Sequence, residues 1–327
     1  MENKIKYVQL SSDNKEKCAV FEKMMAAYVK ELDEHGHDPM PEGFLQKWIK
    51  SIISMQGPSD RHLELCYDGE TLIGFLYGKI DHEDHKGFIK PGYGYIMEFY
   101  VKPEYRRRGY GRAMYRQLEW LFTNDGADKM YLTADPVTGR PFWEAMGFLA
   151  TGERSTENKM EIYEKSVSFD WSGREKLMPL TEETATEIGG WRYESPYDAY
   201  SFRGDADSWL MDRSTWGTEQ FCLADGDRVI GQVACQNDGD DLWVGWSMAP
   251  RLCGKGSGAV FVKKCVTELR RVTGHKGRMM LRVVAWNQRA IHAYQKAGFT
   301  YVKTIQDEIA YSNHMEDFWV MELKSVN

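Results

Sequence analysis

Apolar and polar residues follow the same order of patterns twice along the chain. Each half opens with segments in which apolar residues recur at helical spacing, over residues 18–32, 44–55, 183–194 and 207–216. Short apolar runs then flank an Asp-Gly pair, which is Asp68-Gly69 in the first half and Asp225-Gly226 in the second. An Asp-Gly pair between two apolar runs is a strong β-hairpin signal. The pattern therefore predicts two helices and then a hairpin in each half.

The later part of each half repeats as well. An apolar strand leads into a glycine-rich loop and an amphipathic helix, in which Met114, Leu118 and Leu121 share one face. Another strand and a short helix follow, and the helix ends at Gly147 in the first half and at Gly298 in the second. Glycine is common at the end of a helix because it adopts the left-handed conformation without strain. Strands and helices therefore alternate in both halves.

These repeats predict an α/β protein made of two tandem domains. Gly74 matches Gly231 in the order of elements, and a chain of 327 residues is long enough for two domains of about 150 residues each. Residues 166–175 are polar and have no helical period, which predicts the boundary there. We expect one domain over residues 1–168 and the other over 175–327, each built from helices and strands in the same order.

Composition narrows the classes of function. The net charge of −7 disfavours nucleic-acid binding, which needs a basic surface. The chain has no apolar run of the ~18 residues that a transmembrane helix requires, and its first residues lack the apolar core of a signal peptide. The six cysteines form no CxxC pair, so we expect neither a disulfide framework nor a metal site. We expect a cytoplasmic protein with no membrane or nucleic-acid partner.

Two glycine-rich loops carry the strongest candidate chemistry. Residues 106–111 read Arg-Arg-Arg-Gly-Tyr-Gly, and residues 253–258 read Cys-Gly-Lys-Gly-Ser-Gly. Each loop lies between a predicted strand and a predicted helix, so its backbone N–H groups lie at the positive end of a helix, where anions bind. Nearby arginines add charge-assisted hydrogen bonds to phosphate. Neither loop has the spacing of a Walker A motif or of a dinucleotide-binding fingerprint, so another kind of phosphate site is expected.

The first loop resembles the signature of the GNAT superfamily of acetyl-CoA-dependent N-acetyltransferases. That signature, V-x-P-x-x-[RQ]-x-x-G-x-[GA], is matched in full by Val101, Pro103, Arg106, Gly109 and Gly111. The second loop matches it at Pro250, Gly256 and Gly258. It departs from the signature at Met248, which replaces the valine, and at Cys253, which replaces the arginine. The second loop therefore keeps the backbone donors and lacks the charged side chain.

A second signature of the same family, N-x-x-A-x-x-x-Y-x-x-x-G-F, follows in each half. The second half contains it complete, as Asn287, Ala290, Tyr294, Gly298 and Phe299. The first half has Trp143 at the tyrosine position and Pro136 at the asparagine position. The two signatures extend the resemblance over both halves and most of the chain.

The resemblance implies a mixed, strongly twisted sheet in each domain, with helices on both faces and with the fourth and fifth strands splayed apart. The pantetheine arm of acetyl-CoA would lie in that gap and pair with the backbone of residues 99–101 and 246–248. The glycine-rich loops would bind its phosphates. The implied cofactor-binding residues are Phe99, Tyr100, Val101, Arg106, Arg107, Arg108, Gly109, Tyr110, Gly111, Arg112, Trp246, Ser247, Met248, Cys253, Gly254, Lys255, Gly256, Ser257, Gly258, Asn287 and Tyr294.

Three residues are candidates for roles in acetyl transfer. Tyr294 is the candidate acid, because a phenol of pKa about 10 can protonate a departing thiolate. Glu98, on the strand before the first loop, is the candidate base for the amine, and Gly245 stands at the matching place in the second half. Asn287 either contacts the cofactor or caps the helix that follows it. The candidate base thus lies in the first half, and the candidate acid lies in the second.

The resemblance implies an acyltransferase that moves an acetyl group directly from acetyl-CoA to a primary amine. We expect the acceptor to be a small molecule rather than a protein or peptide amine. In the alternative interpretation, the N-terminal domain, with Trp143 in place of the tyrosine, is a non-catalytic acyl-CoA-binding or structural half. We expect a monomer or a homodimer.

Overall fold

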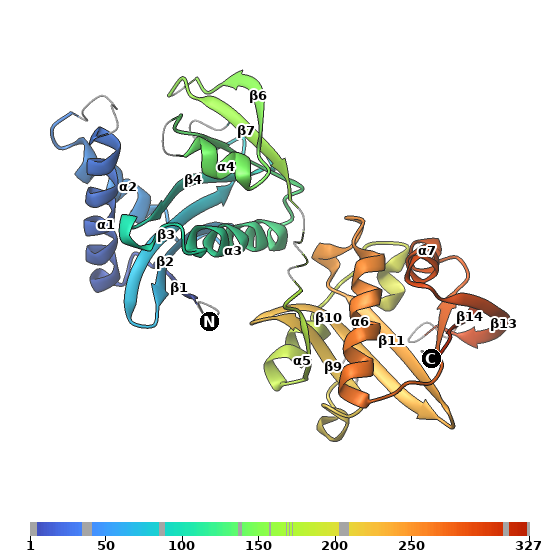
Figure 1. Ribbon diagram of the computed structural model, residues 1–327. Coiled ribbons are helices and arrows are strands. Elements are labelled where there is room, and N and C mark those ends of the chain that lie inside the picture. The colour runs from blue at the N-terminus through green and yellow to red at the C-terminus, as the bar shows by residue number, and fades with distance from the viewer. Residues whose placement is uncertain are drawn as a thin grey trace. The chain divides into compact units, whose positions relative to one another are not determined.

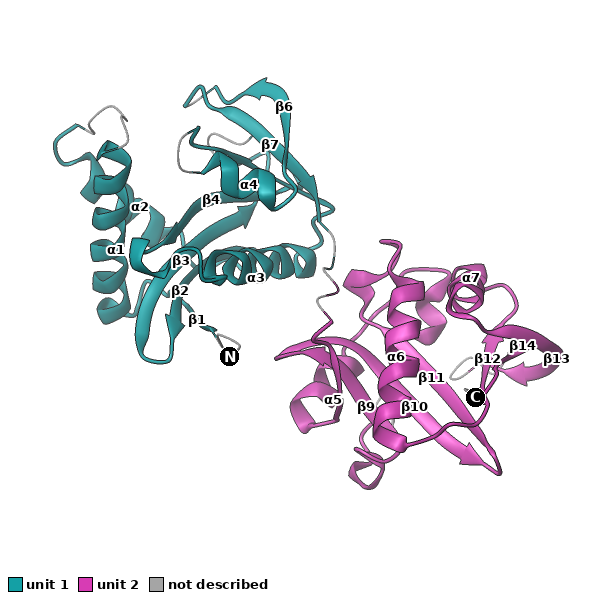
Figure 2. Ribbon diagram, viewed as in Figure 1, with its two compact units in different colours: residues 1–169 teal, residues 170–327 magenta. Residues whose placement is uncertain are grey.

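The computed structural model describes residues 5–34, 41–84, 89–136, 139–156, 158–167, 169, 171, 173–202, 209–309 and 314–325. The chain divides into two compact units, residues 1–169 (unit 1) and 170–327 (unit 2), as Figure 2 shows. Each unit contains one seven-stranded sheet of its own. The fold class is therefore α/β, with two tandem domains.

Unit 1 has the strand order β1-β2-β3-β4-β5-β7-β6, in which β4 and β5 are parallel and the other neighbours antiparallel. Its elements are β1 (Ile5–Gln9), α1 (Lys15–Glu34), α2 (Phe44–Ser54), β2 (Arg61–Asp68), β3 (Thr71–Ile80), β4 (Gly94–Val101), α3 (Tyr110–Asn124), β5 (Lys129–Thr133), α4 (Arg140–Ala145), β6 (Leu149–Arg154) and β7 (Glu161–Ser166). The predicted hairpin is confirmed, because Asp68 pairs with Thr71 across a two-residue turn.

Two apolar clusters hold helices against the sheet of unit 1. Figure 1 shows the two helices concerned, α1 and α3, beside the strands of this sheet. In the first, Phe21 of α1 packs edge-on against Phe75 of β3, with ring centroids 5.2 Å apart. In the second, Met114 and Leu118 of α3 are fully buried, which confirms the predicted apolar face. Burial of such side chains contributes about 2 kcal/mol each to folding. The helices therefore cover the middle of the sheet and leave the end of β4 to the glycine-rich loop.

Unit 2 repeats the topology with the order β13-β14-β12-β11-β10-β9-β8, in which β11 and β12 are the parallel pair. Its elements are β8 (Lys176–Pro179), α5 (Glu182–Gly189), β9 (Gln220–Asp225), β10 (Arg228–Asp238), β11 (Asp241–Met248), α6 (Gly258–Thr273), β12 (Met279–Val284), α7 (Gln288–Ala297), β13 (Thr300–Glu308) and β14 (Met315–Leu323). Asp225 pairs with Arg228, so the second hairpin is also confirmed.

The helices expected early in unit 2 are the main error of the sequence interpretation. The first is shorter than expected, because α5 ends at Gly189 and Gly190 is its C-cap. The described residues of 207–216 hold turns and one 3₁₀ turn, Arg213–Thr215, instead of a helix. Asp212 caps that turn through the Ser214 N–H at 3.0 Å, and such local side-chain bonds compete with a helix.

Several expected absences can be examined in the described residues. No helix there is long and apolar enough to span a bilayer. The same residues contain no group of three or more His, Cys, Asp or Glu side chains that could hold a metal ion. All six cysteines are unpaired, and five of them are buried. Their burial is typical of free cysteines that pack as small apolar side chains.

Candidate active site

In both units the two parallel strands are hydrogen-bonded at one end only and diverge along the rest of their length. β4 pairs with β5 only at Gly94–Met130 and Tyr95–Tyr131, although β4 continues to Val101. In unit 2, β11 pairs with β12 only at two positions, Leu242–Met279 and Trp243–Met280. The backbone of each longer strand is thereby left without a neighbour on that side, which suits an extended ligand that adds to the edge of a strand.

A cavity of about 620 Å³ lies at the gap in unit 1. Its wall is built by helix α1, the end of β4, the glycine-rich loop and helix α4. Small-molecule and cofactor sites occupy about 300–1,000 Å³, so a ligand the length of a pantetheine arm fits this space. The residues that line the cavity and enter the argument below are Tyr28, Glu31, Tyr100, Arg106, Gly109 and Trp143.

The helices after the two loops begin without a side-chain cap. The residue before α3 is Gly109, which adopts a left-handed φ of 88°, and the residue before α6 is Ser257. Neither residue accepts a hydrogen bond from the first turn of its helix through a side chain. By contrast, Thr181 caps α5 and Asn287 caps α7. The first N–H groups of a helix have no partner within it, and together with the helix dipole they bind anions. Both loops therefore fit the phosphates of a nucleotide cofactor.

Arg106 does not present its charge to the loop. Its Nε donates to the Val101 carbonyl at 2.8 Å, and its two terminal nitrogens donate to the Glu31 carboxylate at 2.5 and 2.7 Å. The guanidinium also lies 5.6 Å from the centre of the Tyr100 ring. The predicted phosphate ligand is thus neutralised by α1. Arg107 is next in the loop and adopts a left-handed φ of 61°.

The side chains of three other predicted cofactor residues of unit 1 pack within the protein, so only their backbone groups could bind a ligand. The Phe99 ring stacks on Phe142 of α4 with a centroid distance of 5.7 Å, and Tyr100 points to the opposite face, where it packs near Tyr28. Tyr110 is buried, and its hydroxyl donates to Asp68. A ligand in the cavity would therefore contact main-chain groups at these positions.

Glu98 lies on the face of β4 that packs against α1. Burial raises the pKa of its carboxyl group to about 8, and a hydrogen bond from Tyr28 opposes that rise. The pKa of Tyr28 is raised by burial and then by the Glu98 charge. Tyr28 lines the cavity, as do Met97 and Phe99 on either side of Glu98, whereas Glu98 itself is partly exposed and is not among the lining residues. A carboxylate with a pKa near neutral pH is suited to accept a proton from an ammonium group.

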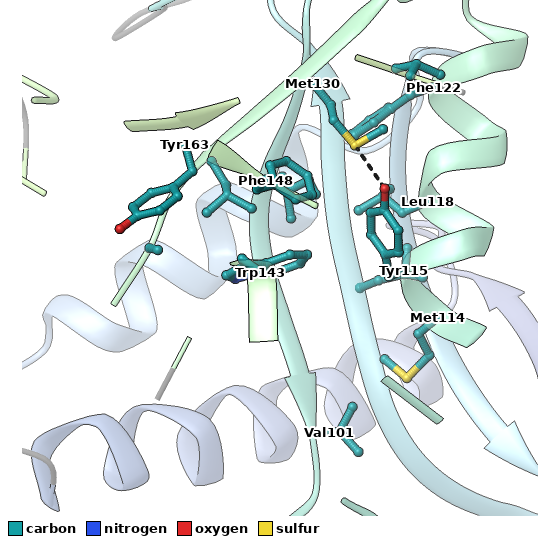
Figure 3. Close-up of a cluster of buried hydrophobic side chains, with 14 of the residues drawn as sticks. Val101, Met114, Tyr115, Leu118, Phe122, Met130, Trp143, Phe148 and Tyr163 are labelled. Atoms are coloured by element: carbon teal, nitrogen blue, oxygen red, sulfur yellow. Dashed lines mark hydrogen bonds between the residues drawn. The ribbon is translucent and has the colours of Figure 1, made fainter. Parts of the chain in front are cut away.

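Trp143 is part of the core in unit 1 (Figure 3). Its ring packs against Phe99, Tyr115 and Phe148 at centroid distances of 5.2, 6.2 and 5.5 Å. The indole also lines the cavity, where it presents no hydroxyl group. The position that holds a tyrosine in the second signature therefore provides shape but no acid in unit 1.

Unit 2 has the opposite set of groups. Tyr294 packs against Trp246 and Phe299, each at a centroid distance of 6.1 Å, and burial raises the pKa of its hydroxyl above the ordinary value. Gly245 has open space where a side chain would begin. The Met248 carbonyl accepts a hydrogen bond from the Tyr193 hydroxyl at 2.9 Å. Unit 2 therefore holds a phenol but no carboxylate at the place of Glu98.

Comparisons with known proteins agree with this geometry. The profile of the acetyltransferase (GNAT) family matches residues 7–148 and 182–299. The chain belongs to the acetyltransferase (GNAT) family. It contains two tandem GNAT domains, and acetyl-CoA is the cofactor typical of that family.

Relatives of this GNAT protein cover between about half and two thirds of the chain. A mycothiol acetyltransferase from Corynebacterium efficiens is 26% identical over 226 residues, which cover 63% of this chain and 71% of the relative. The PaiA N-acetyltransferase from Thermoplasma acidophilum, solved with coenzyme A, is 20% identical with a TM-score of 0.39 and covers 51% of this chain and 99% of its own. The spermidine N-acetyltransferase from Vibrio cholerae, solved with CoA and spermine, is 16% identical with a TM-score of 0.40 and covers 47% and 97%.

Asn287 is placed by the structure in one of its two predicted roles. Its side-chain oxygen accepts a hydrogen bond from the Ala290 N–H at 3.1 Å, so it is the N-cap of α7. Sequence reasoning did not find Tyr28. The signal was available, since Tyr28, Glu31 and Leu32 lie three and four residues apart on α1, and this spacing puts them on one face of the helix.

Proposed function

We propose that this GNAT acetyltransferase transfers an acetyl group from acetyl-CoA to a primary amine of a small molecule. The observation that carries the proposal is Glu98, a carboxyl group whose pKa is raised to about 8 by burial, on the strand that borders the cavity of unit 1. A primary amine is protonated at neutral pH and must lose a proton before it attacks. A base poised near that pH is therefore the group that the reaction needs.

Acetyl-CoA supplies the activated acetyl group when bound. In unit 1, the uncapped N-terminus of α3 would hold its phosphates, and the free side of β4 would hold its extended arm. The hydroxyl of Tyr28, which lines the cavity, interacts with the Glu98 carboxylate and favours its charged form. The proton of the amine would move to a carboxylate oxygen of Glu98.

Unit 2 supports a different part of the chemistry. The Tyr294 hydroxyl carries its proton at neutral pH, as any phenol does, and burial raises its pKa further. It is the group of unit 2 that would give a proton to a departing thiolate. A second candidate function is that unit 1 binds acyl-CoA without turnover. The observation in its favour is Trp143, which has no hydroxyl group where the signature has tyrosine.

The first experiment is a calorimetric titration of the full chain with acetyl-CoA. We expect two sites per chain, because both loops precede an uncapped helix. Gly109→Glu should remove one site and Gly256→Glu the other, since each brings a negative charge to a loop that binds phosphate. If the wild-type chain bound no acetyl-CoA, the proposed function would be wrong.

The second experiment assigns turnover to a unit. Release of CoA thiol is measured with a panel of small primary amines for Glu98→Gln, Tyr294→Phe and the control Glu70→Gln, at an exposed hairpin residue. Loss of turnover only in Glu98→Gln assigns the reaction to unit 1. Loss only in Tyr294→Phe would identify unit 1 as the non-catalytic half.

A further inference from the structure

The loop of unit 2 lacks a cation where the signature has arginine. Cys253 stands at that position, and its Sγ lies 3.6 Å from the Met248 carbonyl oxygen. Burial raises the pKa of the Cys253 thiol, so the side chain is uncharged at neutral pH. Phosphate groups are nevertheless bound most tightly where a guanidinium or ammonium group joins the backbone donors.

Helix α7 brings an arginine toward this loop. Helices α6 and α7 pack together, and a Cβ atom at Gly258, the first residue of α6, would lie 3.1 Å from the Ala293 Cβ. Arg289 is one turn before Ala293 and on the same face of α7, and helical side chains point toward the N-terminus. Arg289 therefore extends along the side of α7 that meets the start of α6.

The electrostatic surroundings agree with this position. Burial raises the pKa of Cys253 and of Tyr193, and the charge of Arg289 opposes the rise at both groups. The Tyr193 hydroxyl bonds to the carbonyl of Met248, the last residue of β11. The charge of Arg289 thus acts on Cys253 within the loop and on Tyr193, which bonds to the end of the preceding strand.

The charge of Arg289 is available to a ligand. The guanidinium lies 3.8 Å from the centre of the Tyr197 ring, and the side chain is exposed. Among the described residues no carboxylate forms an ion pair with it, whereas Arg106 in unit 1 is bound at two points by Glu31. A ring face orients a guanidinium but does not neutralise it.

We infer that Arg289 is a phosphate-binding cation of unit 2, in addition to Lys255 of the loop, and takes over the part of the arginine that Cys253 replaces. The ligand class is a phosphate ester anion, which in this family is the nucleotide end of CoA. This inference rests on the proposed function, because it assigns a residue to the cofactor site of unit 2. Unit 2 would then have a guanidinium group for phosphate, although its signature lacks the arginine.

The test is calorimetric titration of full-length variants with CoA. In a Gly109→Glu background, which leaves the site of unit 2, Arg289→Gln should weaken CoA binding about tenfold or more, as expected for a lost charge-assisted hydrogen bond. Arg289→Glu should weaken it further. In a Gly256→Glu background, which leaves the site of unit 1, Arg289→Gln should have no effect. The matched control is Arg282→Gln, an exposed arginine of β12 that pairs with Asp307.

Pantetheine, which has no phosphate, separates a charge effect from a structural one. Arg289→Gln should leave the affinity for pantetheine unchanged. Equal weakening of CoA and pantetheine would overturn the inference, as would unchanged CoA binding in the Gly109→Glu background. Failure of the wild-type chain to bind CoA at all would instead overturn the proposed function, so the two failures are distinguishable.

Discussion

Glu98 is a carboxyl group whose surroundings disfavour its charge. Its side chain points from β4 toward α1, where the phenol of Tyr28 donates a hydrogen bond to it. Removal from water raises the pKa to about 8, and a single neutral donor does not restore the ordinary value. Such a group binds and releases protons in the range where primary amines become reactive.

We predict that Glu98→Gln lowers turnover by about 100-fold, as expected for loss of a general base. In the wild type, turnover should rise with pH up to about 8, because only the deprotonated carboxylate accepts a proton. Glutamine has no such ionisation, so the rise should disappear in the variant. The measurement is kcat from pH 5.5 to 9.5, and Glu70→Gln, at an exposed hairpin residue, is the control. An unchanged profile in Glu98→Gln would contradict the role.

The same pKa shift predicts a pH dependence of stability. The pKa of Glu98 is higher in the fold than its ordinary value of 4.5, so its contribution to stability is fully present below pH 4.5 and is lost as the pH rises through about 8. Glu98→Gln should therefore gain stability relative to the wild type between pH 5 and pH 9. Urea unfolding at the two pH values measures this difference.

Arg107 has a backbone conformation that side chains disfavour. Its φ is 61°, and the matching residue of unit 2 is Gly254 at φ 76°. Glycine adopts this region freely, whereas other residues pay about 1–2 kcal/mol. We predict that Arg107→Gly raises the free energy of unfolding by about 0.5–1 kcal/mol, after the entropy of glycine in the unfolded chain is subtracted. Arg108→Gly, at the next residue, should give no gain in the same urea titration.

At the scale of elements, the helix N-termini fall into two kinds. Helices α5 and α7 begin with Thr181 and Asn287, whose side chains accept hydrogen bonds from the first turn. Helices α3 and α6 begin without such a bond, after loops rich in glycine. Caps stabilise a helix but occupy the N–H groups that an anion would need. The two helices that follow the loops therefore keep their binding capacity at a cost in stability.

We predict that Asn287→Ala destabilises unit 2 by about 1 kcal/mol, because α7 loses its cap. Asn287→Asp should retain most of the stability, since a carboxylate oxygen also accepts from the Ala290 N–H. Gln295→Ala, an exposed change in the same helix, is the control and should stay within about 0.5 kcal/mol. Chemical unfolding measures all three. Equal effects of the alanine variants would show that the cap contributes nothing.

At the scale of the whole molecule, aromatic residues next to the boundary pack into the unit to which they belong. The Phe169 ring packs against Trp120 of unit 1 at a centroid distance of 5.9 Å. Two residues later, Trp171 packs against Phe261 of unit 2 at 6.3 Å. The passage between the units therefore takes only a few residues.

We predict that residues 1–169 and 170–327, expressed separately, each fold and show one cooperative thermal transition, because each has a complete seven-stranded sheet. Residues 1–160 serve as the control. They lack β7, which pairs with both β5 and β6, and should not fold. Circular dichroism during heating gives the result. Absence of a cooperative transition in either complete half would show that the units depend on each other.

The sequence by itself determined the duplicated order of elements, the two hairpins, the glycine-rich loops and the glycines that end α4 and α7. These features depend on local periodicity and turn chemistry, which a few neighbouring residues decide. The same local reasoning was wrong for residues 207–216, where helical spacing was present but polar side chains bond to the nearby backbone instead.

Only the tertiary structure decided which groups meet at the site. Glu31 and Arg106 are 75 residues apart in the chain, and their contact removes a cation that the signature assigned to phosphate. The interaction of Tyr28 with Glu98 and the effect of the Arg289 charge on Cys253 arise in the same way. A motif fixes the backbone of a loop because that backbone is local. The charge around the loop depends on side chains from distant elements, and it is the fold that brings them together.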